Sequence, residues 1–133
     1  MMTFVLRKHV LGMNFCPPEF LGRHVLAEFW GCRHVDDPQQ VEPALVAAAL
    51  AAGATILQAN IHHFGEGMGV TGVLILAESH LSIHSWPELE YAAVDVFVCG
   101  KADPHRAIAS LVRAFEPRDT KVTEHLRGEL AHA

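Results

Sequence analysis

Six segments of the chain carry the hydrophobic and polar patterns of β-strands. They are rich in β-branched and aromatic residues, or they alternate between apolar and polar positions, as a strand with one buried face does. The predicted strands are His24–Trp30, Ala54–His62, Val70–Ala77, His80–Trp86, Tyr91–Cys99 and Lys121–His125. Within 80–86, Leu81 and Ile83 are expected to face a core, and the residues between them the opposite side.

Two other segments have the spacing of amphipathic helices. Each begins at an aspartate followed by proline, Asp37-Pro38 and Asp103-Pro104, and this pair is typical of a helix N-terminus. The first helix is expected over Val41–Ala52, before Gly53. The apolar stripes are Val41, Ala44, Leu45, Ala48 and Ala49 in the first helix and Ala107, Leu111, Ala114 and Phe115 in the second.

The order of these elements predicts an α+β fold. We expect a two-layer α/β sandwich, with a largely antiparallel sheet and the helices on one face. Strand–helix–strand–strand precedes the region of Ser79, and strands, a helix and a strand follow it, which indicates an internal pseudo-repeat. Since helices would cover only one face of the sheet, the other face predicts at least a homodimer.

Composition narrows the class of protein. A chain of 133 residues is long enough for one domain, here 21–133, preceded by an N-terminal extension, 1–20. The net charge of −5 and the scattered basic residues argue against a nucleic-acid partner, and no apolar run is long enough to span a membrane. The odd number of cysteines, without metal-type spacing, is typical of reduced thiols in the cytoplasm.

The run from Glu78 to Glu88 carries the candidate chemistry. A Glu-Ser step beside histidines is a place where a serine hydroxyl can attack the preceding carbonyl and cut the chain, here between Glu78 and Ser79. Taken alone, Ser79 would be an ordinary turn serine. His80 fits either a site residue or a scaffold residue. No metal is expected, because the His80 and His84 pair lies on a strand and no third ligand completes a site.

This run, with Cys99 twenty residues after Ser79, resembles the prokaryotic S-adenosylmethionine decarboxylase proenzymes over about 21–128. The resemblance implies that Ser79 becomes a covalent pyruvoyl cofactor, which takes up the substrate amine as a Schiff base. It also implies that His84 is the base for the elimination that releases the new terminus, that Cys99 returns a proton to the substrate carbon, and that Thr71 assists cleavage with its hydroxyl.

The same resemblance implies the substrate and its contacts. Phe64 would stack on adenine, and Glu88 would accept hydrogen bonds from ribose hydroxyls. The product would enter spermidine synthesis, and the active form would be a homodimer of cleaved protomers. The loop 65–68 departs from the family pattern, and its Glu66 would also suit the distal cation of ornithine or arginine. A pyruvoyl decarboxylase of those amino acids is therefore one alternative, and an uncleaved regulatory homologue is a second.

Overall fold

The computed structural model describes residues 19–133. The strands are β1 (Phe20–Trp30), β2 (Ile56–His63), β3 (Val70–Leu76), β4 (Ser79–Trp86), β5 (Tyr91–Cys99) and β6 (Asp119–Glu129). The helices are α2 (Pro38–Ala51) and α3 (Pro104–Phe115), and short 3₁₀ turns occupy Pro87–Leu89 (η1) and Leu130–His132 (η2). All six strands and both helices predicted from the sequence are confirmed.

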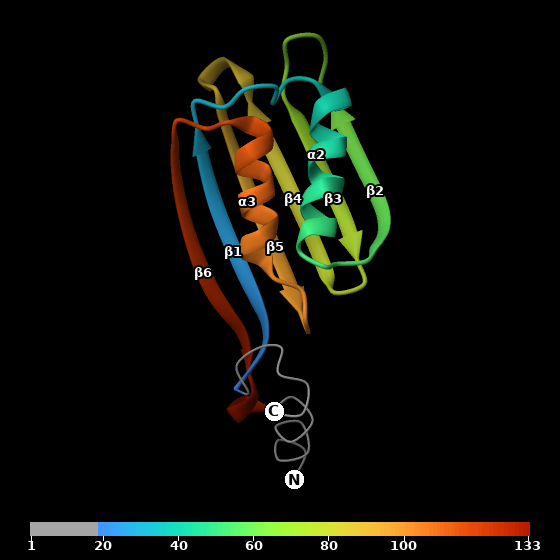
Figure 1. Ribbon diagram of the computed structural model, residues 1–133, viewed down its shortest axis with the longest axis vertical. Coiled ribbons are helices and arrows are strands. Elements are labelled where there is room, and N and C mark those ends of the chain that lie inside the picture. Colours follow the sequence, from blue (N-terminus) through green and yellow to red (C-terminus); the bar gives the residue numbers. More distant parts are fainter. Residues whose placement is uncertain (1–18) are drawn as a thin grey trace.

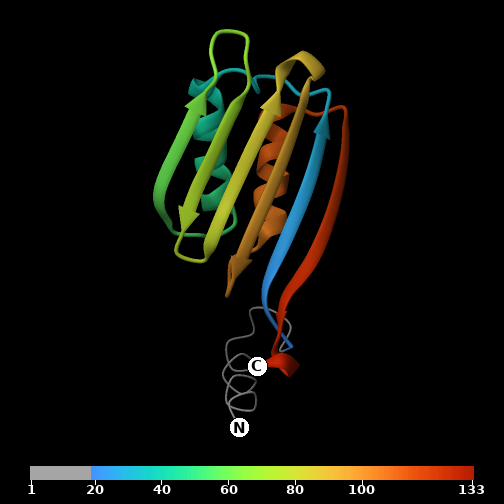
Figure 2. The ribbon, with the colours of Figure 1, turned by 180° about the vertical axis from the view of Figure 1, so that it is seen from behind.

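The six strands form one sheet in the order β2-β3-β4-β5-β1-β6, and every neighbouring pair is antiparallel. Both helices lie on the same face (Figure 1), and the opposite face has no helix over it among residues 19–133 (Figure 2). The predicted α+β sandwich is therefore confirmed. The two halves each contribute three strands and one helix, but in a different order, so the internal pseudo-repeat stays a prediction.

The core lies between the helices and the covered face of the sheet. Because side chains alternate between the two faces of a strand, every second residue points into the core from the sheet, and Phe29, Leu74 and Leu81 are almost fully buried there. Helix α2 covers β2, β3 and part of β4, and α3 covers β1 and β5. From these helices Leu45 and Leu111 complete the core.

Local chemistry fixes where both helices begin. The side chain of Asp37 accepts a hydrogen bond from the backbone N–H of Gln39 at 2.9 Å, and Asp103 accepts one from His105 at 3.0 Å. Each aspartate therefore satisfies an otherwise unpaired donor of the first turn, as the sequence predicted.

Strands β1 and β6 are longer than their patterns predict. Strand β6 extends over Asp119–Glu129 although all its residues are exposed, because its hydrogen bonds to β1, and not burial, make it a strand. Strand β1 already begins at Phe20, which pairs with Glu129, so the sheet takes up the last residue of the predicted extension. Residues 1–18 of that extension lie outside the described residues. Neither described helix is long and apolar enough to cross a membrane.

Candidate active site

The predicted site residues lie at two opposite ends of the sheet. The β3–β4 turn and the end of β5 lie at one end, which carries Glu78, Ser79 and Cys99 and is called the cleavage end. The β2–β3 loop and the β4–β5 connection lie at the other end (Figure 1), which carries Phe64 and Glu88 and is called the pocket end.

The cleavage end is built on a tight hairpin. Leu76 pairs with Ser79, so only Ala77 and Glu78 connect β3 to β4. The segment after α2 holds this turn in place: the N–H of Ala77 donates to the carbonyl of Thr55, and the N–H of Thr55 donates to the Glu78 carboxylate, both at 2.9 Å. The candidate scissile bond is therefore anchored on the N-terminal side.

Ser79 has a strained backbone. Its φ of 139° lies in a region that residues with a side chain rarely adopt. Two-residue hairpins commonly place positive φ angles on glycine or asparagine within the turn. Ala77 and Glu78 are not among the described residues with positive φ, so the unusual angle falls on the serine that follows them. A conformation of this kind costs on the order of 1–3 kcal/mol and is frequent at functional sites.

The carbonyl group before Ser79 is held by a hydrogen bond. The backbone N–H of Cys99, at the end of β5, donates to the carbonyl oxygen of Glu78 at 3.1 Å. A donor in this position can stabilise the negative charge that develops on this oxygen when a nucleophile attacks the carbonyl carbon. The fold thus brings Cys99 beside the candidate scissile bond.

The three cysteines are not equivalent. The Cys99 side chain is exposed on the open face of the sheet. Cys32 is buried, and burial raises the pKa of its thiol to about 11, so this thiol stays protonated. Cys16 lies outside the described residues. Between the two described cysteines, only Cys99 is placed for chemistry at the cleavage end.

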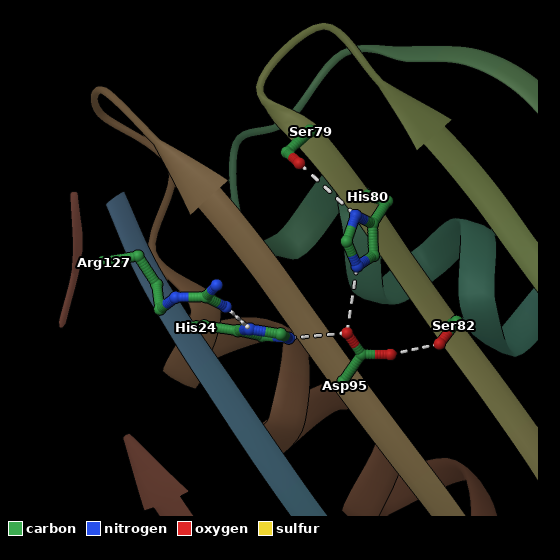
Figure 3. A network of polar contacts seen from close by, with 6 residues as sticks. All are labelled: His24, Ser79, His80, Ser82, Asp95 and Arg127. Carbon is green, nitrogen blue, oxygen red and sulfur yellow. Dashed lines mark hydrogen bonds and ion pairs between the residues drawn. The ribbon is translucent and has the colours of Figure 1, made fainter. Parts of the chain in front are cut away.

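A polar network on the open face reaches the Ser79 hydroxyl (Figure 3). Ser79 Oγ lies 3.3 Å from Nδ1 of His80, and Nε2 of His80 lies 3.0 Å from Oδ2 of Asp95. Ser82 donates to the other oxygen of Asp95, and Nε2 of His24 lies 2.7 Å from Oδ2.

The carboxyl of Asp95 is kept ionised by this network. Burial by itself would raise its pKa, but hydrogen bonds from Ser82, His24 and His80 outweigh burial and lower the pKa below its ordinary value. Arg127 donates to Nδ1 of His24 at 3.0 Å, so the network runs from β6 to β4.

His24, His80 and Asp95 are also the group of described residues whose donor atoms lie close enough together to surround a metal ion. Ligand atoms around zinc stand roughly 3.3 Å apart, as follows from zinc–nitrogen distances of about 2.0–2.1 Å in a tetrahedron. The 2.7 and 3.0 Å separations here are those of hydrogen bonds. The geometry fits a hydrogen-bonded network better than a ligand set.

The pocket end gathers the other predicted residues. Nδ1 of His84 lies 2.6 Å from the Thr71 hydroxyl, and the His84 and Phe64 rings are 5.9 Å apart. A pocket of about 320 Å³ opens beside them. Its lining residues are Phe64, Met68, Gly69, His84, Ser85, Trp86 and Glu88. The exposed Glu66 is not among them.

Within one chain, the cleavage end and the pocket end of the sheet lie far apart. Ser79 and His84 are the first and sixth residues of β4. At about 3.3–3.4 Å per residue, their Cα atoms are roughly 17 Å apart. Sequence reasoning placed them in one site and did not find Asp95 or His24. A signal for Asp95 was present, since it is the one charged residue in an otherwise apolar strand, Tyr91–Cys99.

Comparison with known proteins identifies the family. The family model for S-adenosylmethionine decarboxylase matches residues 23–128. A relative from Thermomicrobium roseum, named S-adenosylmethionine decarboxylase proenzyme, is 48% identical over 109 residues, which cover 81% of this chain and 94% of the relative. A relative of the same name from Moorella thermoacetica is 50% identical over 111 residues, which cover 81% and 88%.

Comparison of the fold with solved structures leads to the same family. The crystal structure of the adenosylmethionine decarboxylase from Aquifex aeolicus matches with a TM-score of 0.75 and 35% identity, covering 83% of this chain and 92% of that one. The sheet, the Glu78-Ser79 turn and these comparisons agree, and the chain belongs to the S-adenosylmethionine decarboxylase family.

Proposed function

We propose that this protein is a self-processing, pyruvoyl-dependent decarboxylase that acts on S-adenosylmethionine. One observation carries the proposal: Ser79, with a strained backbone, directly follows a carbonyl group that already accepts a hydrogen bond from the Cys99 N–H. This is the arrangement that attack by a serine hydroxyl on its own preceding peptide bond requires.

Self-cleavage would proceed by an N-to-O acyl shift at Glu78 and Ser79. The Ser79 oxygen attacks the Glu78 carbonyl carbon, and the Cys99 N–H stabilises the charge on the carbonyl oxygen. Removal of the Ser79 Cα proton by His84 then releases the Glu78 carboxylate. Hydrolysis of the remaining dehydroalanine consumes water, releases ammonia and leaves the pyruvoyl group on the chain that begins at position 79.

In decarboxylation, the pyruvoyl group supplies an electron-withdrawing carbonyl that accepts the electrons left when CO2 departs. Cys99 is the last residue of β5 and is exposed at the cleavage end, and its thiol would return a proton to the substrate carbon. Phe64 and Glu88 line one pocket, which suits a nucleoside: the ring can stack on adenine and the carboxylate can accept from the ribose hydroxyls.

A homodimer would complete this site. Since the cleavage end and the pocket end of one chain are far apart, we propose that two chains pack their open sheet faces together in opposite directions, so that Ser79 of one chain meets His84 of the other. The open face supports this packing with exposed apolar side chains in Leu26, Trp30 and Ile75. Each dimer would then hold two shared sites.

No feature of the described residues favours ornithine or arginine as the substrate. The sequence argument for them rested on Glu66, and this exposed side chain does not line the pocket beside Phe64. The product would enter spermidine synthesis. We place the protein in the cytoplasm, where a reducing environment keeps the Cys99 thiol free.

Mass spectrometry of the intact protein and a CO2-release assay test this function. The wild-type chain should separate into 1–78 and 79–133, the latter beginning with a pyruvoyl group, and should release CO2 from S-adenosylmethionine. Ser79→Ala should give one uncut, inactive chain. A cut Ser79→Ala chain would contradict the site, and release from ornithine or arginine alone would contradict the substrate. An uncut, inert wild-type chain would indicate a regulatory homologue.

A further inference from the structure

We propose that His80 is the general base that takes the hydroxyl proton of Ser79 during self-cleavage, and that Asp95 is the positioning residue that holds its ring. The assignment rests on the proposed function. It adds a base for the first step, the acyl shift, which is distinct from the later elimination assigned to His84.

The hydrogen bonds fix which ring nitrogen of His80 can accept a proton. An ionised carboxylate only accepts hydrogen bonds, so the contact with Asp95 places the hydrogen of neutral His80 on Nε2. The lone pair is then on Nδ1, which is the atom that faces Ser79 Oγ at 3.3 Å (Figure 3). A nucleophile, a base and a carboxylate that orients the base are therefore connected in sequence.

The same reasoning explains the rest of the network. Arg127 can only donate, so Nδ1 of His24 accepts from it and Nε2 of His24 donates to Asp95. Ser82 donates to the remaining oxygen of Asp95. With three donors the carboxylate is fixed in place, and it stays ionised because these hydrogen bonds lower its pKa.

The ionisable groups around His80 come from three strands. Asp95 on β5 and His24 on β1 face it directly, and Arg127 on β6 acts through His24. Phe97 supplies an apolar neighbour, with its ring 5.8 Å from that of His80. His84, four residues further along β4, contacts Thr71 instead and lies at the other end of the face.

The acyl shift needs no proton or electron from outside the chain. The hydroxyl proton passes to Nδ1 of His80 while Ser79 Oγ bonds to the carbonyl carbon of Glu78. The same proton then goes to the amide nitrogen of Ser79 as the carbon–nitrogen bond breaks. The products are an ester and a free amine at Ser79, and His80 returns to its neutral form.

The test separates this step from the elimination. The full chain carrying His84→Gln is made by cell-free synthesis, and samples are taken over time with and without hydroxylamine. Hydroxylamine cleaves an ester and spares an amide, so the fragments count every chain that has completed the acyl shift. Adding His80→Gln should slow ester formation by roughly 10²–10⁴-fold, the usual contribution of a general base.

Two further readouts distinguish a base from a structural residue. With His80 present, ester formation should slow as the pH is lowered, because a protonated imidazole cannot accept the hydroxyl proton, and His80→Gln should remove this dependence. Asp95→Asn should also slow it, because the amide can donate to Nε2 and favour the opposite tautomer of His80. The asparagine side chain has nearly the same size as that of aspartate, so Asp95→Asn changes the hydrogen bonding and not the packing.

His105→Gln is the matched control. His105 also pairs with a carboxylate, Glu124 at 3.0 Å, but it belongs to α3, which lies on the face of the sheet opposite the His80 network, so this variant should form the ester at the parent rate. Ester formation at the parent rate and with the parent pH profile in both His80→Gln and Asp95→Asn would overturn the assignment and leave the proposed function intact. A wild-type chain that never forms the ester would overturn both.

Discussion

At the scale of single residues, the strain at Ser79 has a local cause. The turn before it contains no glycine, so neither Ala77 nor Glu78 takes the positive φ that a two-residue hairpin usually needs. The strain therefore lies on Ser79, the residue that follows the proposed scissile bond, and the acyl shift would relieve it. In this reading the hairpin favours cleavage as well as connecting two strands.

Asp95 should make the uncut protein sensitive to acid. Its folded pKa is lowered below the ordinary value of about 3.9, so the unfolded chain binds more protons in the window between the two values. The stabilisation is therefore fully present above the ordinary value and is lost as the pH falls through the folded value. Urea unfolding of Ser79→Ala protein should show the midpoint falling over this window.

The variant Asp95→Asn, made in the same Ser79→Ala background, serves as the comparison. It removes the titrating group, so its midpoint should fall less steeply below about pH 4, where an ordinary aspartate becomes protonated. Equal acid sensitivity in the two proteins would show that other carboxylates, such as Glu124, whose pKa is also lowered, account for the effect.

At the scale of elements, the geometry of β4 explains how His80 and His84 can have different roles. His80 and His84 share the open face of β4 because they are four residues apart. The same spacing puts them about 13 Å apart at 3.3–3.4 Å per residue. One strand can thus present one histidine to its own Ser79 and the other to a partner chain.

The helix caps make a prediction at the same scale. Asp37→Ala should destabilise the protein by about 0.5–2 kcal/mol, since it removes the acceptor for the Gln39 N–H at the start of α2. The measurement is urea unfolding of the Ser79→Ala protein with and without this change. The neighbouring exposed aspartate gives the control: Asp36→Ala should change the free energy of unfolding by less than about 0.5 kcal/mol, and an equal loss in both variants would refute the cap.

At the scale of the whole molecule, the proposed cut would not divide the fold into two separate parts. Residues before position 79 supply β1, β2 and β3, and the rest supply β4, β5 and β6. In the sheet, β1 lies between β5 and β6, so the two fragments interleave. They share one core and are expected to stay together after cleavage.

Sharing of sites between two chains can be tested by co-expression. Ser79→Ala and His84→Ala chains should each remain uncut alone, because one lacks the nucleophile and the other the base for elimination. Expressed together with different tags, they should form mixed dimers in which the His84→Ala chain is cut, since its Ser79 meets the intact His84 of its partner. Mass spectrometry identifies the cut chain, and two uncut chains in a confirmed mixed dimer would refute the shared site.

The sequence alone determined the elements and was enough to predict where the chain would be cut. Period-two and helical patterns, aspartate caps and the Glu78-Ser79 run are local, so each could be recognised from neighbouring residues. Strand β6 was predicted at less than its full length, because an exposed strand is defined by pairing with β1 and leaves no hydrophobic signal.

Only the tertiary structure decided how the candidate site is assembled. Sheet order and register bring His24 to Asp95 across 71 positions of the chain, and the Cys99 N–H to the Glu78 carbonyl. The same geometry separates Ser79 from His84, which are only five residues apart, because an extended strand carries its residues steadily away from one another. Proximity within a sheet follows from strand order and register, and neither can be predicted from the spacing of residues along the chain.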